Sequence, residues 1–502
     1  MYTLGFDVGS SSLKATLLDV ETGTVIASAL SPETELEIIA KKPGWAEQYP
    51  EVWWEHAKRA TAKILSGGIP AADIGAIGIS YQMHGLVIVD RDHKVLRPSI
   101  IWCDSRAVEI GEEAFRELGE ENCLKQFLNS PGNFTASKLK WVKDNEPEIY
   151  RKIYRVMLPG DYIALKMTGK VTTTPSGLSE GIMWNYQRKG RADEVLSYYG
   201  ISPELIPEVV STFAVQGELT TTAAEELGLK AGTKITYRAG DQPNNALSLN
   251  VLNPGEIAAT AGTSGVVYGV TDTANYDPLS RVNTFVHVNH TVQDPRYGVL
   301  MCVNGTGILN SWLKHTIMGE NLAGEAYDAM NERAASIPVG SDGLVIIPYG
   351  NGAERTLENR DIKGSLHGLN FNTHSRGHLF RAAQEGIVFA LNYGLGVMRD
   401  MGVAVDKVRA GHANMFLSPV FREAFATVTK ATVELYNTDG SQGAARGAGI
   451  GVGFYQTPAD AFAGLKTTMV IEPNKSLLTP YEQAYEQWLD VLKSLLPAQK
   501  GE

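Results

Sequence analysis

One local pattern occurs twice in this chain: a strand, a turn of glycine and hydroxyl residues, and a second strand. In the first copy, residues 2–8 and 13–20 are rich in strand-forming residues, and Gly9-Ser10-Ser11-Ser12 joins them. In the second copy, Gly262-Thr263-Ser264-Gly265 joins two strands predicted within residues 256–270. One copy lies at the N-terminus and the other near the middle of the 502 residues. This placement favours two homologous halves, which we divide between residues 246 and 247.

Length and composition exclude several classes of protein. At roughly 100–200 residues per domain, the chain is expected to form two to four domains. Hydrophobic residues make up 43%, enough for a packed core, so the chain is not intrinsically disordered. The 45 Lys and Arg against 56 Asp and Glu give a net charge of −11, which argues against a nucleic-acid-coating protein and leaves a local basic patch open. No apolar run approaches the roughly 18 residues that a membrane helix needs.

The cysteines and the first residues indicate a cellular compartment. The three cysteines, Cys103, Cys123 and Cys302, show no paired spacing, so a disulfide framework or a zinc cluster is not expected. The first seven residues have no basic region before an apolar one, and so do not form a signal peptide. We therefore expect a cytoplasmic protein that works in a reducing environment.

Strands and helices alternate along the first half, which predicts the α/β class. Two long helices are expected in the second half. The predicted strands are residues 76–80, 86–89 and 100–103, and the predicted helices are 50–66, 107–118, 378–400 and 419–433.

The first turn has the composition of a phosphate site. Gly9, Ser10 and Ser11 present backbone N–H groups and short hydroxyl side chains to a phosphate. Asp7, at the end of the preceding strand, is suited to Mg²⁺, which prefers one or two carboxylates together with phosphate oxygens. Lys14 adds a positive charge. The alternative is an ordinary β-turn with a solvated lysine.

The second turn repeats this chemistry with Gly262 and Thr263. Two such turns, one from each half, would hold a polyphosphate from both sides. In isolation each turn is also compatible with a purely structural role.

Asp241 is the candidate proton acceptor. Pro243 is expected to push Gln242 into an extended conformation, and one of the following asparagines is expected to cap a helix over residues 246–250. Asp241 would then lie on an irregular stretch between the two halves, where ligand sites form. A carboxylate there can accept a proton from a hydroxyl nucleophile. The alternative is an ordinary turn aspartate.

Polar residues that follow predicted strands are candidates for binding a small polar ligand. His84, in Gln82-Met83-His84-Gly85, follows the strand over residues 76–80, and Asp104 and Arg106 follow the strand at residue 100. The alternatives are a structural histidine and a local salt bridge between Asp104 and Arg106. The histidines show no metal-binding spacing.

Two glycine-rich stretches lie in the second half. Gly411 follows a predicted strand and allows the close approach of a flat ring, and Asn414 offers an amide. The small residues of 440–449 favour close helix packing. The chain has neither a P-loop pattern nor a dinucleotide-binding glycine pattern after a strand.

In their order and spacing these motifs resemble the FGGY carbohydrate kinases, and within them the xylulokinases, from about residue 3 to about residue 455. The Asp7-to-Lys14 segment is similar to the first phosphate motif of the family, and Gly262-Thr263-Ser264-Gly265 to the second. Gly44-Trp45-Ala46-Glu47-Gln48 resembles another N-terminal stretch. Met83-His84-Gly85 is typical of xylulokinases, whereas glycerol kinases carry an Arg-Glu pair there. Gln242 departs from many xylulokinases, which have asparagine, and matches glycerol kinases.

The resemblance implies a two-domain, duplicated α/β fold of the actin, hexokinase and Hsp70 type (ribonuclease H-like), with an interdomain cleft. Residues 1–246 would form the N-terminal domain with the sugar site and the first phosphate turn. Residues 247–502 would form the C-terminal domain with the nucleotide site.

The resemblance also implies ATP and Mg²⁺, and it assigns roles to residues of this sequence. Asp241 matches the catalytic base, and Asp7 and Asp241 would hold the metal. The expected substrate-binding residues, including those argued above, are Met83, His84, Asp104, Arg106 and Gln242. The expected nucleotide-binding residues are Gly9, Ser10, Ser11, Lys14, Gly262, Thr263, Gly307, Gly411 and Asn414.

The implied reaction is ATP-dependent phosphorylation of D-xylulose to D-xylulose 5-phosphate in pentose catabolism. A kinase for another ketopentose or polyol, such as ribulose, fuculose or glycerol, is the nearest alternative. A non-kinase ATPase of the actin and Hsp70 type and a sugar-sensing protein without turnover are alternatives of other classes. The expected partners are the sugar and MgATP, without nucleic acid or membrane, and a homodimer stays open.

Overall fold

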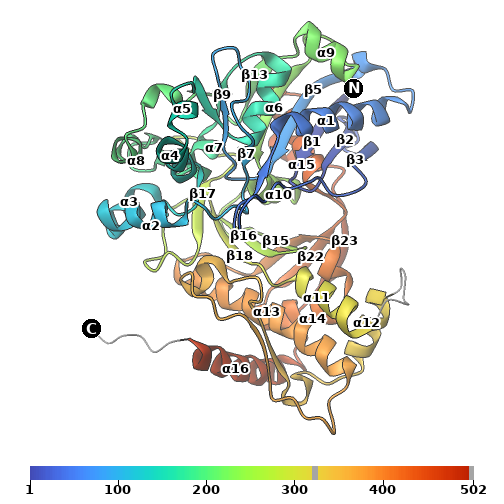
Figure 1. Cartoon of the computed structure of the whole chain (residues 1–502). Coiled ribbons are helices and arrows are strands. Elements are labelled where there is room, and N and C mark those ends of the chain that lie inside the picture. Colours follow the sequence, from blue (N-terminus) through green and yellow to red (C-terminus); the bar gives the residue numbers. More distant parts are fainter. Residues whose placement is uncertain (319–325, 497–502) are drawn as a thin grey trace.

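The computed structural model describes residues 1–318 and 326–496, and Figure 1 shows them as two lobes, each built around a mixed sheet. Within these residues, no helix has both the length and the apolar character that a membrane crossing requires.

The first sheet has six strands in the order β13-β14-β5-β1-β2-β3. Strands β1 to β3 form the predicted antiparallel meander, while β5 and β14 run parallel to β1. The carboxyl ends of β1, β5 and β14 therefore meet at one edge of the sheet. The bounds are β1 (Tyr2–Val8), β2 (Leu13–Asp19), β3 (Val25–Ser31), β5 (Ile74–Tyr81), β13 (Phe213–Glu218) and β14 (Lys234–Gly240).

The second sheet has seven strands in the order β17-β18-β16-β15-β21-β22-β23. Strands β15 and β16 are antiparallel, as β1 and β2 are, and β21 and β22 run parallel to β15, as β5 and β14 do to β1. Apart from the added β17, strand order and direction repeat, so the predicted duplication is confirmed. The bounds are β15 (Ile257–Ala261), β16 (Gly265–Thr271), β17 (Asn283–Val286), β18 (Tyr297–Val303), β21 (Lys407–Gly411), β22 (Thr432–Tyr436) and β23 (Thr467–Ile471).

Helices and short ribbons surround the two sheets. The helices are α1 (Pro50–Leu65), α2 (Val108–Glu117), α3 (Glu120–Phe127), α4 (Thr135–Asn145), α5 (Pro147–Tyr150), α6 (Pro159–Thr168), α7 (Pro175–Glu180), α8 (Asp193–Tyr199), α9 (Thr221–Leu227), α10 (Asp241–Ser248), α11 (Gly307–Leu313), α12 (Ala326–Ala335), α13 (Arg376–Asp400), α14 (Pro419–Thr429), α15 (Gly440–Val452) and α16 (Leu478–Leu495). The short strands are β4 (Glu47–Gln48), β6 (Val87–Val89), β7 (Ser99–Ile100), β8 (Arg155–Met157), β9 (Thr172–Thr173), β10 (Trp184–Asn185), β11 (Gly190–Arg191), β12 (Glu208–Val209), β19 (Val345–Pro348) and β20 (Gly364–His367).

Helices α10 and α15 join the lobes. They follow the equivalent strands β14 and β22, and they pack against each other. Figure 1 shows α15, an orange helix from late in the sequence, among the blue strands of the first lobe. Glycines permit this approach: a Cβ on Gly5 would lie 2.0 Å from the Ser441 carbonyl oxygen, and one on Gly78 would lie 2.0 Å from that of Ala444. The predicted close packing of the glycine-rich helix is confirmed.

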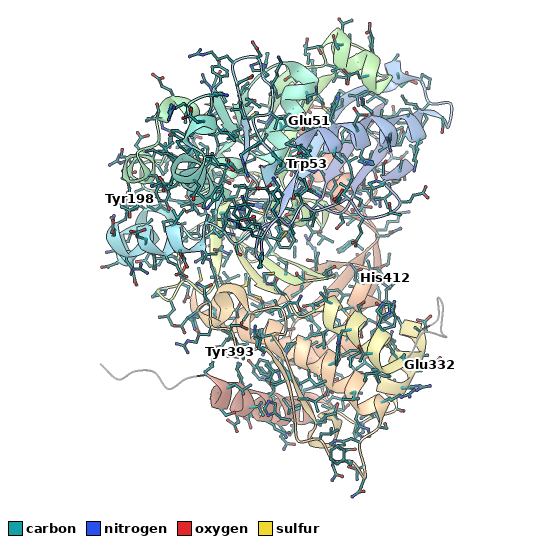
Figure 2. The ribbon with its side chains drawn as sticks, viewed as in Figure 1. Glu51, Trp53, Tyr198, Glu332, Tyr393 and His412 are labelled. Atoms are coloured by element: carbon teal, nitrogen blue, oxygen red, sulfur yellow. The ribbon has the colours of Figure 1, made fainter. Side chains whose placement is uncertain are left out.

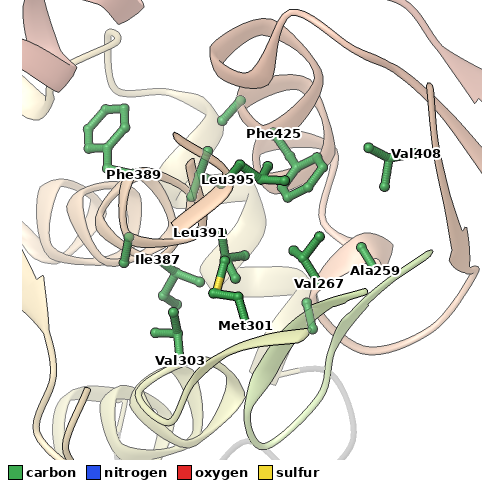
Figure 3. Packing of buried hydrophobic residues seen from close by; sticks show 14 of the residues in the cluster. Ala259, Val267, Met301, Val303, Ile387, Phe389, Leu391, Leu395, Val408 and Phe425 are labelled. Atoms are coloured by element: carbon green, nitrogen blue, oxygen red, sulfur yellow. The ribbon is translucent and has the colours of Figure 1, made fainter. Parts of the chain in front are cut away.

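The core of the second lobe forms around α13. Ile387, Leu391 and Leu395 recur every four residues, so they line one face of this helix, and Figure 3 shows them beside Met301 of β18 and Phe425 of α14. All five side chains are buried. This packing fixes the sheet whose carboxyl edge carries the second phosphate turn.

Two predicted elements differ in the structure. The helix predicted over residues 419–433 ends at Thr429, because Lys430 adopts a left-handed conformation with φ of 59°, and residues 432–436 form β22 instead. This stretch is rich in β-branched residues, and β22 hydrogen-bonds to strands on both sides. The strand predicted over residues 100–103 is reduced to Ser99–Ile100.

Candidate active site

The carboxyl edge of the first sheet brings the candidate catalytic residues together. In the strand register, Asp7 lies opposite Ser80, and Ser80 lies opposite Ala239. The segments that follow these strands carry Met83, His84 and Asp241. Residues separated by more than 200 positions thus meet at one edge, where α/β proteins place ligand contacts.

Asp7 is held at the start of helix α15. The Ser80 hydroxyl donates a hydrogen bond of 2.8 Å to Asp7 Oδ1. A Cβ on Gly440, the first residue of α15, would lie 2.3 Å from Asp7 Oδ2, so a larger residue there would displace the Asp7 carboxylate. Burial raises the pKa of Asp7 to about 6; the Ser80 hydrogen bond lowers it, and the charge of Asp439 raises it.

Lys14 forms an ion pair with Asp439, a residue 425 positions away. Asp439 is the N-cap of α15: its Oδ1 accepts from the Gln442 backbone N–H at 3.1 Å and from the Ser441 hydroxyl at 2.7 Å. Lys14 and these donors hold the pKa of Asp439 below its usual value against the effect of burial. The lysine of the first turn is therefore not a freely solvated side chain.

Asp241 is the first residue of helix α10, and the predicted irregular stretch with an extended Gln242 is wrong. Gly240 is the extended N-cap, and Pro243 occupies the third helical position. Proline fits there because the first N–H groups of a helix have no partner within the helix. The Asp241 carboxylate consequently lies at the positive end of a helix.

The pKa of Asp241 is raised to about 7. Burial is the largest cause, and the nearby charge of Asp7 adds to it. Hydrogen bonds from the backbone and side chain of Gln242 act in the opposite direction. A carboxylate with a pKa close to neutral is suited to accept and release a proton.

Hydrogen bonds fix the two helix N-termini against each other. The Asn244 side-chain amide of α10 donates to the Gly440 carbonyl oxygen at 2.8 Å. The Ser248 hydroxyl donates to the Asp439 carbonyl oxygen at 2.7 Å. Three carboxylates, those of Asp7, Asp241 and Asp439, therefore surround the point where α10 and α15 begin.

The chemistry of this carboxylate set fits Mg²⁺. The described residues contain no group of three or more His, Cys, Asp or Glu side chains placed to hold a metal. Mg²⁺, however, is usually held by one or two carboxylates with water and phosphate oxygens. A cation beside Asp7 and Asp241 would also relieve the repulsion that contributes to their raised pKa values.

His84 follows β5 in a left-handed conformation with φ of 61°. Its Nδ1 lies 2.8 Å from the Glu180 carbonyl oxygen. Because a carbonyl oxygen can only accept, Nδ1 carries the proton and Nε2 keeps its lone pair. Burial, together with the charge of Lys138, lowers the pKa of His84 to about 3, so the ring is neutral.

Apolar side chains surround His84. The ring of Phe134 packs edge-on against it at 4.7 Å, and Phe285 from the second sheet lies at 5.5 Å. Met83 is buried beneath the last residue of β14, since a Cβ on Gly240 would lie 2.6 Å from Met83 Cγ. Both lobes therefore contribute to this part of the site.

Asp104 and Arg106 form a buried ion cluster with Glu47. Arg106 donates to both oxygens of Asp104 and to Glu47, and the side chains of Asp104 and Arg106 are 0% and 1% exposed. The Arg106 guanidinium also lies 3.8 Å from the ring centre of Trp45. This arrangement favours the alternative of a local salt bridge over a sugar contact.

The first turn is closed by a hydrogen bond of 3.0 Å from the Gly9 N–H to the Ser12 carbonyl oxygen. Gln48 donates to the Ser10 carbonyl oxygen at 2.7 Å, and the Trp102 indole donates to the Ser10 hydroxyl at 3.2 Å. Ser11 is exposed. The turn is thus anchored from one side while its tip stays open to solvent.

The second turn lies at the carboxyl edge of the second sheet. The Gly307 N–H, at the start of α11, donates to the Gly262 carbonyl oxygen at 2.8 Å, and the Ile308 N–H donates to that of Thr263 at 3.2 Å. A Cβ on Gly262 would lie 3.6 Å from the side-chain nitrogen of Asn414. Gly411 ends β21, which runs parallel to β15. The residues of this half that are predicted to bind the nucleotide therefore lie close together.

His412, labelled in Figure 2, lies beside this group, and its Nδ1 is 3.1 Å from the Thr468 hydroxyl on β23. Its ring therefore contacts β23, the edge strand of the second sheet, two strands away from β21.

Sequence reasoning missed several residues of the site. Asp439 had a local signal, since an aspartate three residues before a glutamine, Gln442, and next to a glycine-rich helix is a typical N-cap. Glu180, Lys138 and Phe285 had none, because their positions depend on packing between distant segments. Lys138 donates to the His84 and Ile101 carbonyl oxygens at 2.9 and 3.0 Å.

Comparisons with known proteins agree with this geometry. Residues 2–248 match the model of the FGGY family of carbohydrate kinases, N-terminal domain, and residues 257–452 match that of the C-terminal domain. The chain is 29% identical to a xylulose kinase of Bacillus subtilis, with 100% of both chains covered. It is 28% identical to a xylulose kinase of Escherichia coli, with 98% of this chain and 99% of the relative covered.

Solved structures of carbohydrate kinases have the same fold as this chain. The crystal structure of a xylulose kinase from Rhodospirillum rubrum superimposes with a TM-score of 0.88 at 27% identity and covers 99% of both chains. A Plasmodium falciparum glycerol kinase with ADP has a TM-score of 0.86 at 20% identity, with 99% of both chains covered, and at this identity it shows the fold alone. The expected two-domain α/β fold is confirmed.

Proposed function

The chain belongs to the FGGY family of carbohydrate kinases, and from this premise we propose that it transfers the terminal phosphoryl group of ATP to D-xylulose. Family membership makes it an enzyme with a carbohydrate and ATP as substrates, which excludes the non-kinase ATPase and the sugar sensor. Full-length similarity to xylulose kinases supports the choice of sugar. The observation that carries the proposal is Asp241 at the start of α10, beside Asp7 and close to Met83 and His84.

Asp241 is proposed as the base. Asp241 is half-buried at the edge of the first sheet, and its raised pKa of about 7 suits it to accept the proton of the terminal hydroxyl. Phosphoryl transfer passes through a loose transition state, so orientation of the hydroxyl matters more than removal of its proton. The helix N-terminus that carries Asp241 holds it in a fixed orientation.

His84 is proposed to bind the sugar through Nε2. The proton on Nδ1 is committed to the Glu180 carbonyl oxygen, so Nε2 can accept a hydrogen bond from a sugar hydroxyl. The aromatic rings of Phe134 and Phe285 offer an apolar face for the carbon skeleton. Gln242 follows Asp241 directly in the sequence, and it is also proposed to bind the sugar.

Asp7 and Asp241 are proposed to hold Mg²⁺, which when bound neutralises charge on the transferred phosphoryl group. Asp7 lies at the positive end of α15 and accepts from Ser80, so its carboxylate is held toward the place where α10 and α15 begin. The ion pair between Lys14 and Asp439 places a further cation at the same end of α15.

The nucleotide is proposed to contact both phosphate turns. Gly9, Ser10 and Ser11 would bind phosphate oxygens from the first lobe, and Gly262 and Thr263 from the second. Gly307, Gly411 and Asn414 would contact the nucleoside. In this division, residues 1–246 bind the sugar and carry the first phosphate turn, and residues 247–502 bind the rest of the nucleotide, with α15 returning to the first sheet. We propose that the enzyme works in the cytoplasm.

An ADP-release assay over a panel of sugars tests this proposal. We expect the highest kcat/KM with D-xylulose among xylulose, ribulose, fuculose, gluconate and glycerol. The folded Asp241→Asn variant is the control, and its sugar-dependent ADP release should be about 10²–10⁴-fold slower. A parent enzyme that prefers glycerol would refute the choice of substrate, and a parent without sugar-dependent ADP release would refute the kinase activity.

A further inference from the structure

Glu180 is a buried acidic residue to which the proposed reaction gives no role. It ends helix α7, its side chain is 1% exposed, and it lies between the strand end that carries His84 and the one that carries Asp241. One carboxyl oxygen accepts a hydrogen bond of 2.6 Å from the Tyr81 hydroxyl. The other accepts one of 3.0 Å from the backbone N–H of His84.

His84 is thereby bound to Glu180 at two points. Its backbone N–H contacts the carboxyl group, and its ring Nδ1 contacts the backbone carbonyl oxygen of the same glutamate. His84 has a φ of 61°, in the left-handed region that residues with a Cβ seldom adopt. A residue in that region persists only where its surroundings hold it, and it is often found at ligand sites. The two hydrogen bonds to Glu180 stabilise His84 in this conformation.

Glu180 also lies next to the residue that precedes Asp241, the proposed base. A Cβ on Gly240, the residue before Asp241, would lie 3.3 Å from both carboxyl oxygens of Glu180. Burial, joined by the charge of Asp241, raises the pKa of Glu180 well above its usual value. The Glu180 carboxyl group therefore contacts both the residue proposed to bind the sugar and the residue that precedes the proposed base.

We propose that Glu180 is a positioning residue, which through its two hydrogen bonds holds His84 in its left-handed conformation and so aims the imidazole Nε2 at the sugar. This inference rests on the proposed function, because it takes His84 as the sugar contact. Glutamine has the same shape, its side-chain oxygen can accept from the His84 N–H, and its NH2 group can donate to the Tyr81 oxygen, so it should replace Glu180 without loss.

Kinetics of Glu180→Gln and Glu180→Ala test the role. For Glu180→Gln we expect kcat/KM for D-xylulose within about 3-fold of the parent, because both hydrogen bonds are retained. For Glu180→Ala we expect a loss of about 5–150-fold, the range for an unpaired buried group, with an unchanged KM for ATP. Tyr81→Phe is the matched control, since it removes the other bond to Glu180 but leaves both bonds to His84, and it should stay within about 3-fold.

A double-mutant cycle with His84 separates this role from a purely structural one. If Glu180 acts through His84, adding Glu180→Ala to His84→Ala should change kcat/KM for xylulose by less than about 3-fold. Full additivity would overturn the inference, as would parental kinetics in Glu180→Ala. Should Glu180→Ala fail to fold, Glu180→Gln still decides, because a folded Gln variant that has lost more than about 10-fold although it can keep both hydrogen bonds contradicts the positioning role.

The same cycle distinguishes failure of this inference from failure of the proposed function. If His84→Ala alone keeps parental xylulose kinetics, His84 does not bind the sugar and the premise fails. If His84→Ala is impaired while Glu180→Ala is not, the premise stands and the positioning role of Glu180 is wrong.

Discussion

Replacing Asp241 by asparagine should lower turnover and, at the same time, stabilise the ligand-free protein. The turnover loss follows from the proposed role as base, for which about 10²–10⁴-fold in kcat is the usual span. The gain in stability follows from the charge. A buried carboxylate whose pKa is raised costs free energy when it ionises in the folded state, and asparagine removes that charge while keeping nearly the same shape.

The magnitude follows from the pKa of Asp241. Folding raises it from 3.8 to about 7. At about 1.4 kcal/mol per pKa unit, this limits the cost of the ionised carboxylate to about 4 kcal/mol. Because Asp241 is partly exposed, water screens the charge, and we expect about half of that value. For a domain of 150–250 residues, about 2 kcal/mol corresponds to roughly 4–8 °C in Tm.

The dependence on pH has a definite sign. A carboxyl group with a raised folded-state pKa contributes its full stability below the unfolded-state value and loses it as pH rises through the folded-state value. The parent should therefore lose stability relative to Asp241→Asn between about pH 4 and pH 8. The difference in Tm should be small at pH 5 and large at pH 8.

Thermal denaturation at pH 5 and pH 8, without nucleotide or Mg²⁺, measures this effect, and ADP release measures turnover. Asp490→Asn is the control, because Asp490 is 81% exposed on α16 and its replacement should shift Tm by less than about 1 °C at either pH. A Tm difference for Asp241→Asn that does not grow with pH would refute the buried-charge reasoning. Near-parental kcat in the folded variant would refute the role as base.

Other substitutions test the remaining parts of the site. Thr263→Val should weaken ATP binding more than sugar binding in calorimetry, and equal ATP affinity in variant and parent would contradict its assignment to the nucleotide. His84→Ala should lower kcat/KM for xylulose by about 5–150-fold without changing the KM for ATP, whereas a packed structural histidine would cost Tm and both affinities together. Arg106→Met leaves the buried Asp104 without its ion-pair partner, while Glu47 keeps Arg97, so the free energy of unfolding in denaturant titrations should fall by about 3–5 kcal/mol, and an unchanged value would argue against the ion cluster. Mg²⁺ should raise the Tm of the parent more than that of Asp7→Asn, and equal shifts would speak against Asp7 as a ligand.

The sequence by itself determined the parts of the fold that depend on near neighbours. The strand-turn-strand pattern around Gly9 and Gly262 fixed two hairpins, because side-chain alternation and turn residues act over only a few positions. Their repetition indicated the duplicated sheets, and the small residues of α15 indicated its close packing. The resemblance to a known family added the roles of Asp7 and Asp241, although the helix that begins at Asp241 was predicted to begin later.

Only the tertiary structure decided which distant groups meet. The ion pair of Lys14 with Asp439 joins residues 425 positions apart, and the contacts of Glu180 with His84 span 96. Neither has a local signal, because a charged or carboxyl side chain can face solvent as readily as a partner until the sheets and helices are packed. Parallel strands brought Asp7 and Asp241 to one edge, and the burial there, a property of the whole fold, raised the pKa values of both carboxyl groups.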